Sequence, residues 1–579
     1  MVINMKNLFK NLKFSWNYVK NDKKYLFIIA FVNIIDILLN VIIPILSAKI
    51  IIELTSNNFE RIIIIAIMIF IVHFMTSIVR STARLLSTKL YRNTLSKIEV
   101  DLGSNVLKLE NNCLDSNSSG VFIQRLTNDT TRMADVFNNL LGIIGTILKD
   151  IGVFIAIFIV NKIVFTYIVI TMIILYFLEK IRTDIRNKND KEARVYKEKV
   201  SGFIGELVRG ARDIKMLNSE KDFIEELDKR ISTANDKIKT MHTNSIKYST
   251  INWIVSDLFS FILIILLVIL IEKGYIISSI ALILYNYSRN VEYSIYTIGY
   301  LLEYIKDYNL SCERLIDILD DNKFKKETFG NTHLDKVNGN FEFIDVSFNY
   351  EKKKILKDLS FKINANETVA FVGKSGSGKT TIFNLLCKMY DVKKGKITID
   401  GIDIKELDKD SIRGNITIIS QNPYIFNMSI KDNLKLVKKD LTDKEMINAC
   451  KIACLDDFIK TLPNKYDTII GEGGVNLSGG QKQRLAIARA LVQKTEIILF
   501  DEATSALDNE TQTKIQEAIE NMKGEYTILI IAHRLSTIKN ANRILLLEDG
   551  KITAEGTHNE LLKNCQSYKR LYESENIKK

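Results

Sequence analysis

The chain has 579 residues, of which 47 % are apolar and 26 % are charged, with a net charge of +12. Its mean hydropathy of +0.05 is too high for a soluble chain with so many charges, so the apolar residues must be clustered. Six Cys without a tight spacing and only 3 Pro exclude a disulfide scaffold and a Pro-rich disordered chain. The length suggests about two to four domains. The basic surplus fits either nucleic acid or loops that face an anionic membrane surface.

Six long apolar runs occupy the first half of the chain. They span residues 25–52, 62–79, 136–160, 163–178, 251–271 and 275–302. A helix that crosses a membrane requires about 20 mostly apolar residues, and most of the runs reach that length. A buried core helix could explain any single run, but six of them predict a bundle of six transmembrane helices. Because the preceding tail has no small-residue cleavage site, we interpret the first run as an anchor and not as a signal peptide.

Positive charge distinguishes the connections between these runs. Three connections are short, whereas 80–135 and 180–250 carry eight and seventeen Lys or Arg, and residues 1–24 carry six Lys. Since cationic loops stay in the cytoplasm, we expect both termini and both long connections inside, which accounts for the charge of +12 without nucleic acid. The long connections contain no Pro, so the helices should continue into the cytoplasm, with turns near 111–120 and 202–210.

The second half has the pattern of a nucleotide-binding α/β domain. Strands are expected at 341–348, 354–363 and 369–372, followed by a helix over 382–389. Before that helix, the stretch Gly373, Lys374, Ser375, Gly376, Ser377, Gly378, Lys379 and Thr380 fits the phosphate-binding-loop pattern, and every fixed position of the pattern is filled. Such a loop turns its backbone N–H groups toward a phosphate. We expect Lys379 to contact the β- and γ-phosphates of a nucleotide and Thr380 to bind Mg²⁺.

A second buried strand, 497–500, runs directly into two acids, Asp501 and Glu502. An acid at a strand end beside a phosphate loop is a typical Mg²⁺ ligand, which predicts that role for Asp501. Glu502 is then placed to polarise an attacking water as a general base. The alternative is an ordinary acidic strand end, but four apolar residues running straight into both acids favour the catalytic interpretation.

Several further motifs resemble those of the ATP-binding-cassette (ABC) proteins. The sequence Leu477-Ser478-Gly479-Gly480-Gln481 is similar to the signature motif of that family and lies 20 residues before Asp501. Gln421 resembles the Q-loop glutamine, and His533 resembles the switch histidine. Residues 505–508 are similar to the D-loop, and Tyr350 is similar to the aromatic residue that stacks on adenine.

This resemblance implies roles for residues that spacing alone does not define. Gln421 and His533 should position the attacking water and the γ-phosphate, and Gln421 should also bind Mg²⁺. Further contacts to ATP are implied for Thr381, Ser478, Gly480 and Gln481. ATP and Mg²⁺ are therefore the expected cofactors.

The first half resembles the ABC exporters, which have six helices with long intracellular extensions. Residues 120–129 and 206–220 are similar to their two intracellular loops, and 311–315 to the sequence just before the cassette. Gly473 departs from the pattern, since bacterial exporters often have Arg there beside the acid kept here as Glu472; this puts fine coupling, but not ATP hydrolysis, in doubt. We expect an α-helical transmembrane bundle fused to an α/β P-loop ATPase cassette. Its parts are a tail (1–24), a transmembrane domain (25–310), a linker (311–340) and the cassette (341–579).

The resemblance implies an ATP-driven exporter of an amphipathic or hydrophobic cargo (a drug, a lipid or a peptide) in a bacterial cell membrane. Because one cassette supplies only half of each ATP site, it also implies a dimer, in which Ser478 and Gly480 of one copy face Lys379 of the other. A homodimer and a heterodimer with a degenerate half-transporter both stay open, as does an ATP-gated channel or regulator on the same scaffold. The apolar runs disfavour a soluble ABC ATPase that acts on DNA or ribosomes. The fusion of both parts in one chain disfavours an importer.

The predicted spans contain several ionisable side chains, among them Asp36, His73, Lys149, Asp150, Asp257, Arg289 and Glu292. They could line a polar cargo cavity, or they could bond one helix to another. We favour the cavity for Asp36 and Lys149, which lie nearer the middle of the bilayer. For Asp257, Arg289 and Glu292 we favour helix-to-helix bonds or a place in the cytoplasmic extension. Their mixed signs do not select a cationic or an anionic cargo.

Overall fold

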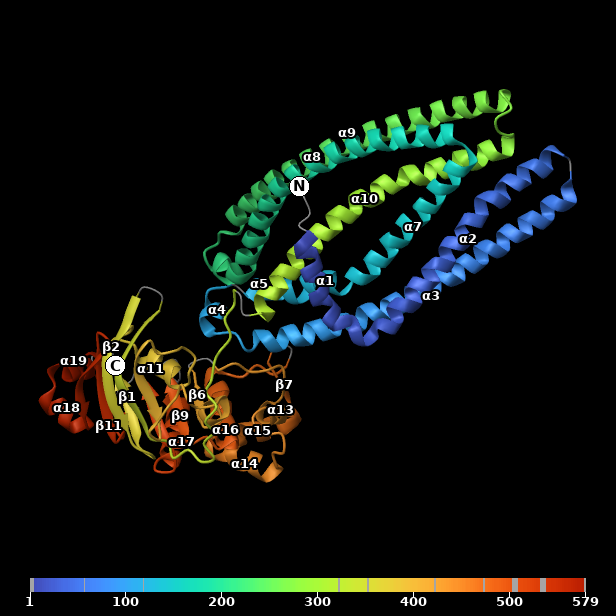
Figure 1. The fold of residues 1–579 in the computed structure, drawn as a ribbon. Helices are drawn as coiled ribbons and strands as arrows, with labels where there is room; N and C mark the ends of the chain where they lie inside the picture. The colour runs from blue at the N-terminus through green and yellow to red at the C-terminus, as the bar shows by residue number, and fades with distance from the viewer. Residues whose placement is uncertain are drawn as a thin grey trace. The chain divides into compact units, whose positions relative to one another are not determined.

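The computed structural model describes residues 5–56, 58–117, 119–320, 323–350, 353–420, 423–471, 474–501, 509–531 and 538–576. The chain forms two compact units, one helical and one built on sheets (Figure 1). The helical unit comprises Met1–Lys108 and Asn117–Lys325. The second unit comprises Lys326–Lys579 together with Leu109–Ser116, a short segment from the first half of the chain.

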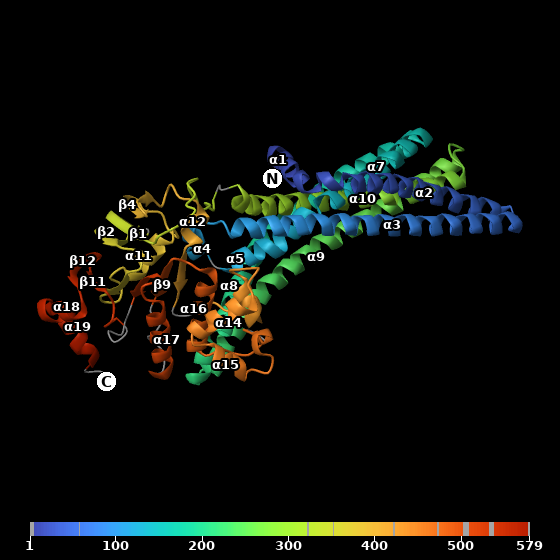
Figure 2. The same cartoon turned by 90° about the horizontal axis from the view of Figure 1, so that it is seen from below.

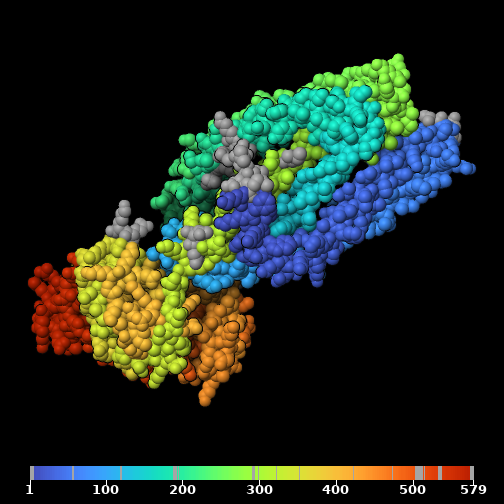
Figure 3. Space-filling model, viewed as in Figure 1, coloured from blue at the N-terminus to red at the C-terminus, as the bar shows by residue number. Residues whose placement is uncertain are grey.

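Long helices dominate the helical unit, which is an elongated body in the space-filling view (Figure 3). Their bounds are α1 (Met5–Val19), α2 (Lys23–Thr55), α3 (Phe59–Val106), α5 (Ser119–Gln124), α6 (Thr130–Ala134), α7 (Val136–Val160), α8 (Lys162–Met216), α9 (Glu220–Glu272) and α10 (Ser278–Leu319). A 3-10 turn, η1 (Lys20–Asp22), follows α1, and a π-helical turn, η2 (Arg125–Asp129), precedes α6. Helices α2 and α3 form one hairpin and α8 and α9 another, as both ribbon views show (Figures 1 and 2).

Five helical stretches of the described residues are long and apolar enough to cross a membrane: Lys6–Leu54, Phe59–Val106, Gly120–Val160, Lys162–Arg186 and Glu220–Glu272. They contain the first five predicted runs. From residue 278 onward the sixth run lies within α10, where Tyr, Ser and Asn interrupt the apolar residues and reduce the mean hydropathy. Large apolar side chains such as Phe27 and Phe70 are about 70 % exposed in the chain alone, which suits a surface that lipid covers.

The structure places the turn of the first long connection near its predicted position and the turn of the second farther along the chain. The first turns where expected, because α3 ends at Val106 and the five-residue helix α4 (Asn111–Asp115) follows. The second prediction is wrong: α8 runs straight through 202–210 and ends at Met216. The reversal occurs at Asn218, whose φ of +52° lies in the left-handed region, just before α9. A glycine inside a long helix costs only about 1 kcal/mol, so the glycines of 202–210 do not end α8.

The second unit is built around a six-stranded sheet with the order β12-β11-β3-β10-β9-β6. Its strands are β3 (Thr368–Val372), β6 (Ile416–Ile419), β9 (Ile497–Asp501), β10 (Thr527–Ile531), β11 (Arg543–Glu548) and β12 (Lys551–Gly556). A four-stranded antiparallel sheet has the order β2-β1-β4-β5, formed by β1 (Phe341–Tyr350), β2 (Lys353–Ile363), β4 (Lys394–Ile399) and β5 (Ile402–Asp403). A short pair joins β7 (Met428–Ser429) to β8 (Ile469–Ile470). The strands predicted before the phosphate loop are all present.

Helices also belong to this unit. They are α11 (Lys379–Leu386), α12 (Lys409–Arg413), α13 (Ile430–Lys435), α14 (Asp443–Ile452), α15 (Asp456–Thr461), α16 (Gly479–Gln493), α17 (Asn509–Met522), α18 (His558–Asn564) and α19 (Gln566–Asn576), with a 3-10 turn η3 (Lys465–Asp467). Alternate residues of β3 enter different apolar clusters: Ala370 and Val372 one, Val369 and Phe371 the other. Because both faces of the sheet are covered there, its central strands β3 and β10 are buried along their whole length and nearly all apolar.

Candidate functional site

The carboxyl ends of four parallel strands meet at one edge of the six-stranded sheet. Strand β10 lies between β3 and β9, so that Ile531 pairs with both Phe371 and Asp501. Strand β6 pairs with β9 on the other side, and its Ile419 lies opposite Phe500. Ligands of open α/β sheets bind at this carboxyl edge. The phosphate loop follows β3 and Asp501 ends β9, so both predicted parts of the site lie there.

The phosphate loop requires glycine at its two ends. At Gly373, a Cβ atom would lie 2.1 Å from the Leu547 carbonyl oxygen. At Gly378, φ is +108° and a Cβ atom would lie 2.7 Å from Leu356 Cδ2. No side chain fits at either point, and the loop is held close to β11 and β2. Lys379 Nζ lies across the loop and donates to the carbonyl oxygens of Gly373 (2.8 Å) and Lys374 (3.1 Å).

The loop residues fit a phosphate group. Ser377 Oγ is buried and has no hydrogen-bond partner within the part of the chain that the structure describes. The first backbone N–H groups of α11 face the same loop, and a helix N-terminus attracts anions. Lys374, Ser375 and Gly376 are exposed, whereas Lys379 and Thr381 are buried at the base of the loop. An acceptor-rich anion would satisfy the Ser377 hydroxyl and draw the Lys379 ammonium away from the loop carbonyls.

Two oxygen atoms lie together beside the loop at the positions predicted for Mg²⁺ ligands. Thr380 Oγ1, at the start of α11, donates to Asp501 Oδ1, at the end of β9, over 3.3 Å. Mg²⁺ prefers oxygen ligands and is commonly bound by one or two protein groups plus phosphate oxygens. The pair fits that requirement, since one hydroxyl and one carboxylate converge where the phosphate loop begins its helix.

The signature sequence forms the N-terminus of α16. Ser478 Oγ accepts a hydrogen bond from Gln481 N (3.3 Å), and the Gln481 side-chain oxygen accepts one from Ser478 N (2.8 Å). This is a capping box, which satisfies two backbone donors that the helix cannot satisfy itself. Because Ser478 Oγ acts as an acceptor here, its own hydroxyl proton can still be donated. The predicted ATP contacts Gly480 and Gln481 lie in the first turn of the same helix.

Tyr350, the predicted adenine platform, ends β1 and belongs to a cluster of three aromatic rings. Its ring centroid lies 4.9 Å from that of Phe348 and 5.1 Å from that of Tyr390, both nearly perpendicular to it. Tyr390 follows α11 and was not singled out in the sequence, because a single Tyr after a helix carries no recognisable pattern.

Several predicted site residues lie outside the described residues. These are the three expected catalytic groups and three further motif positions: Gln421, Glu502, His533, Glu472, Gly473 and the D-loop 505–508. Each catalytic group comes one or two positions after β6, β9 or β10, the strands whose ends meet at the site edge.

Two acids of the predicted spans, Asp36 and Asp150, have partners on other helices. Asp36 of α2 accepts from Arg80 Nε of α3 over 2.9 Å, and Arg80 also donates to Asn40 Oδ1 over 3.1 Å. Asp150 of α7 accepts from the Ser294 hydroxyl of α10. These contacts bond one helix to another, so for Asp36 they favour helix-to-helix bonding over the cargo cavity. The sequence did not identify either partner, because nothing local relates residues that lie on different helices.

Two family models match the chain. The model described as ABC transporter transmembrane region matches residues 26–290, and the model described as ABC transporter matches residues 356–505. The first match includes the helices that are long enough to cross a membrane. The second includes the phosphate loop, the signature helix and β9. The chain is thus a multi-pass membrane protein with a nucleotide-binding unit.

Relatives with curated names include several transporters. An ATP-dependent lipid A-core flippase of Desulfotalea psychrophila is 45 % identical over 45 % of this chain, and the match covers about half of that relative, 46 %. A protein of the same name from Wigglesworthia glossinidia brevipalpis is 33 % identical over 79 % of each chain. The ABC transporter ATP-binding protein YfiC of Bacillus subtilis is 29 % identical over 97 % of this chain and 93 % of YfiC. The chain therefore belongs to the ABC transporter family, whose transmembrane region and cassette it carries in a single polypeptide.

Proposed function

We propose that this chain is one half of an ATP-hydrolysing exporter that moves an amphipathic or hydrophobic molecule out across a bacterial cell membrane. The observation that carries the proposal is the meeting of the phosphate loop with the Thr380–Asp501 pair in a chain that also has membrane-crossing helices. The names of the flippase relatives support a lipid cargo within this class. A drug or a peptide would suit the same apolar bundle. In this arrangement both termini lie in the cytoplasm.

In the proposed mechanism the chain's own groups bind and orient the nucleotide. Lys379 leaves the carbonyl oxygens of its loop and binds the β- and γ-phosphates, while Tyr350 stacks on the adenine. Thr380 and Asp501, with Gln421, would hold Mg²⁺, which would neutralise charge on the phosphates. Bound MgATP supplies the phosphoryl group whose transfer to water provides the driving free energy. Glu502 accepts a proton from that water, and His533 and Gln421 orient it.

The proposed active form is a dimer, because the signature helix serves the nucleotide of the other copy. Ser478, whose oxygen already caps α16, donates its proton to a phosphate held by Lys379 of the second copy. Gly480 allows the backbone to approach that phosphate closely. Nucleotide held between two copies favours the closed state of the cassettes, and a ligand with such a preference shifts a conformational equilibrium. The simplest dimer has two identical copies; a homologous half-transporter could replace one of them.

ATP hydrolysis by the chain expressed alone and reconstituted in lipid tests this proposal. We expect wild-type protein to hydrolyse ATP and the Glu502→Gln variant to retain ATP binding but lose hydrolysis, because the amide cannot accept the proton. ATP binding without hydrolysis in the wild type would contradict the homodimer and direct the search to a partner half-transporter. ATP-dependent movement of a labelled lipid in inside-out vesicles then tests export. Single-channel currents in place of such movement would favour the gated channel.

A further inference from the structure

Two segments that join the helical unit to the cassette converge on one turn of the cassette, residues 387–390. In the first, Asn111 of α4 donates through Nδ2 to the Met389 carbonyl oxygen over 3.3 Å. In the second, Glu327 forms two hydrogen bonds with Arg413 (2.7 and 2.8 Å), and Arg413 also donates to the Lys388 carbonyl oxygen over 3.0 Å. The two segments are themselves joined by an antiparallel bridge between Leu109 and Lys326. This turn directly follows α11, the helix whose first residue is Lys379.

Tyr390 connects this turn to the predicted adenine platform. Its ring lies 5.1 Å from the Tyr350 ring at an interplanar angle of 89°, and 5.9 Å from the Phe348 ring. Phe348 is buried, so the two tyrosine rings pack against a fixed apolar support. Perpendicular aromatic pairs of this kind are a preferred geometry and restrict the tilt of both rings. The orientation of Tyr350 therefore depends on where Tyr390 is held.

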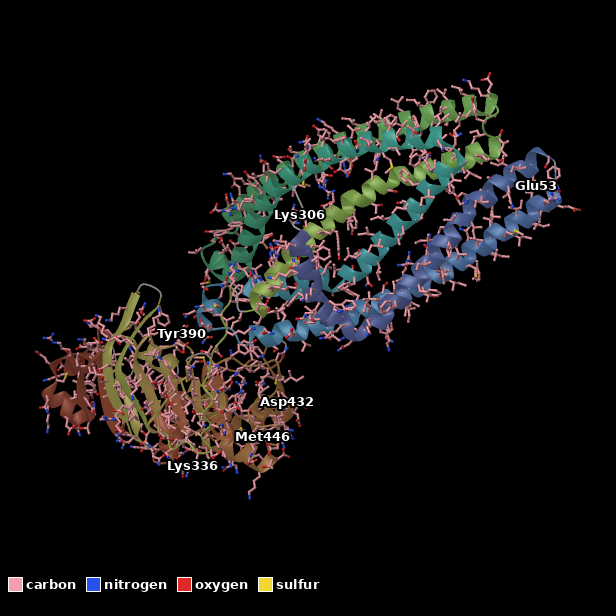
Figure 4. All side chains as sticks on the ribbon, viewed as in Figure 1. Glu53, Lys306, Lys336, Tyr390, Asp432 and Met446 are labelled. Atoms are coloured by element: carbon pink, nitrogen blue, oxygen red, sulfur yellow. The ribbon has the colours of Figure 1, made fainter. Side chains whose placement is uncertain are left out.

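The Tyr390 hydroxyl is held by α4. It donates to Asp115 Oδ2 over 2.5 Å, and Asp115 is the last residue of that helix. Burial and the neighbouring Asp115 carboxylate raise the pKa of Tyr390 above its ordinary value, so the phenol keeps its proton and remains the donor at neutral pH. A hydrogen bond to a charged acceptor is stronger than a neutral one. One side chain, labelled in Figure 4, thus contacts the adenine platform with its ring and α4 with its hydroxyl.

We propose that Tyr390 is a positioning residue that links adenine binding at Tyr350 to the placement of α4 through its hydrogen bond to Asp115. The inference rests on the proposed function, because the role of Tyr350 belongs to it. A base stacked on Tyr350 selects one orientation of that ring, and Tyr390 must adjust to it while still bonded to Asp115. Such coupling is reciprocal. If base binding shifts the equilibrium between two placements of α4 by some factor, the affinity for the base differs between those placements by the same factor. The phosphate-binding groups are not part of this path.

Binding measurements on the full-length chain test the first half of the inference. The probes are ATP and inorganic triphosphate, which has the phosphates but no base. We expect Tyr390→Ala to weaken ATP binding about tenfold, the scale of one base–aromatic stack, and to leave triphosphate binding unchanged. Tyr390→Phe, which keeps the ring, should bind ATP more tightly than Tyr390→Ala. Equal losses for both probes would show general damage to the cassette and would overturn the positioning role.

The natural thiol of Cys113 on α4 tests the second half. Its alkylation rate can be followed by mass spectrometry, separately from the other five cysteines. We expect ATP to change this rate in the wild type and to have no effect in Tyr390→Phe or Asp115→Ala. Asp115→Asn, which keeps an acceptor oxygen, should restore the effect. The same response to ATP in Tyr390→Phe as in the wild type, or no response in the wild type, would overturn the link.

Lys379→Ala separates this inference from the proposed function. This variant should bind neither ATP nor triphosphate, because it lacks the lysine that contacts the phosphates. If the wild type binds neither ATP nor triphosphate, the proposed function fails and the link fails with it. If the wild type prefers ATP to triphosphate and the Tyr390 variants behave like it, the inference alone is wrong.

Discussion

At the scale of single residues, the Thr380–Asp501 hydrogen bond defines the site most sharply. The two oxygens are 3.3 Å apart, close enough for one metal ion to contact both. We expect Asp501→Asn to reduce the gain in ATP affinity that Mg²⁺ provides by about tenfold or more, as for loss of a metal ligand or its support. ATP binding without Mg²⁺ should be unchanged or tighter, because one negative charge beside the phosphates is removed. Calorimetric titration with and without Mg²⁺ measures both quantities.

Asp457→Asn is the matched control for this change. Asp457 is an acid of the same unit with a fully exposed side chain. Its replacement by Asn should leave the Mg²⁺-dependent gain in ATP affinity at the wild-type value. An equal Mg²⁺-dependent gain in Asp501→Asn and wild-type protein would mean that another group holds the metal.

At the scale of the element, helix α16 gives Ser478 two separable tasks. Its oxygen caps the helix, and its proton is available for a phosphate. Ser478→Asp keeps an acceptor for the cap but cannot donate, so we expect near-wild-type thermal stability without ATP hydrolysis. Ser478→Ala should lose hydrolysis and also about 1 kcal/mol of stability, the usual value of such a cap. Thermal unfolding and ATPase assays on the same preparations measure both effects.

Ser478→Thr provides the positive control, because threonine both accepts and donates and should keep stability and hydrolysis. Hydrolysis by Ser478→Asp at the wild-type rate would mean that the hydroxyl proton has no role at the phosphate.

At the scale of the whole molecule, the proposed dimer predicts that two inactive copies can restore one another. Lys379→Ala loses the phosphate contact but keeps an intact signature helix. Ser478→Arg loses the signature contact but keeps Lys379. In a mixed dimer one site combines the intact Lys379 of one copy with the intact Ser478 of the other. We expect each variant alone to be inactive and an equimolar mixture to hydrolyse ATP at about a quarter of the wild-type rate, if the sites act independently. Tagged copies purified in tandem provide the mixed dimer directly.

A mixture of Lys379→Ala with Glu502→Gln is the matched negative control. Lys379 and Glu502 serve the same nucleotide from the same copy, so neither site of this mixed dimer is complete and no activity should return. Activity in this control, or none in the first mixture, would contradict a site shared between copies.

Parts of this structure were predictable because their signals are local. The strands of the cassette appear as apolar runs, since both faces of the sheet are covered, and the phosphate loop is a contiguous sequence between a strand and a helix. The turn of the second long connection was not predictable in the same way. Glycines near residue 205 suggested it, but α8 continues to Met216, because a single glycine weakens a long helix without ending it.

The order of the motifs by itself determined the family, the division into a helical and a nucleotide-binding half, and the residues that form the phosphate-loop pattern, because each of these depends on neighbours in the chain. The tertiary structure decided which distant residues share a contact. It placed Asp501 beside Thr380, Arg80 beside Asp36, and Tyr390 between Tyr350 and Asp115. These pairs are separated by tens to hundreds of positions. Only the packing of helices and the pairing of strands bring them within reach, and no local pattern encodes that proximity.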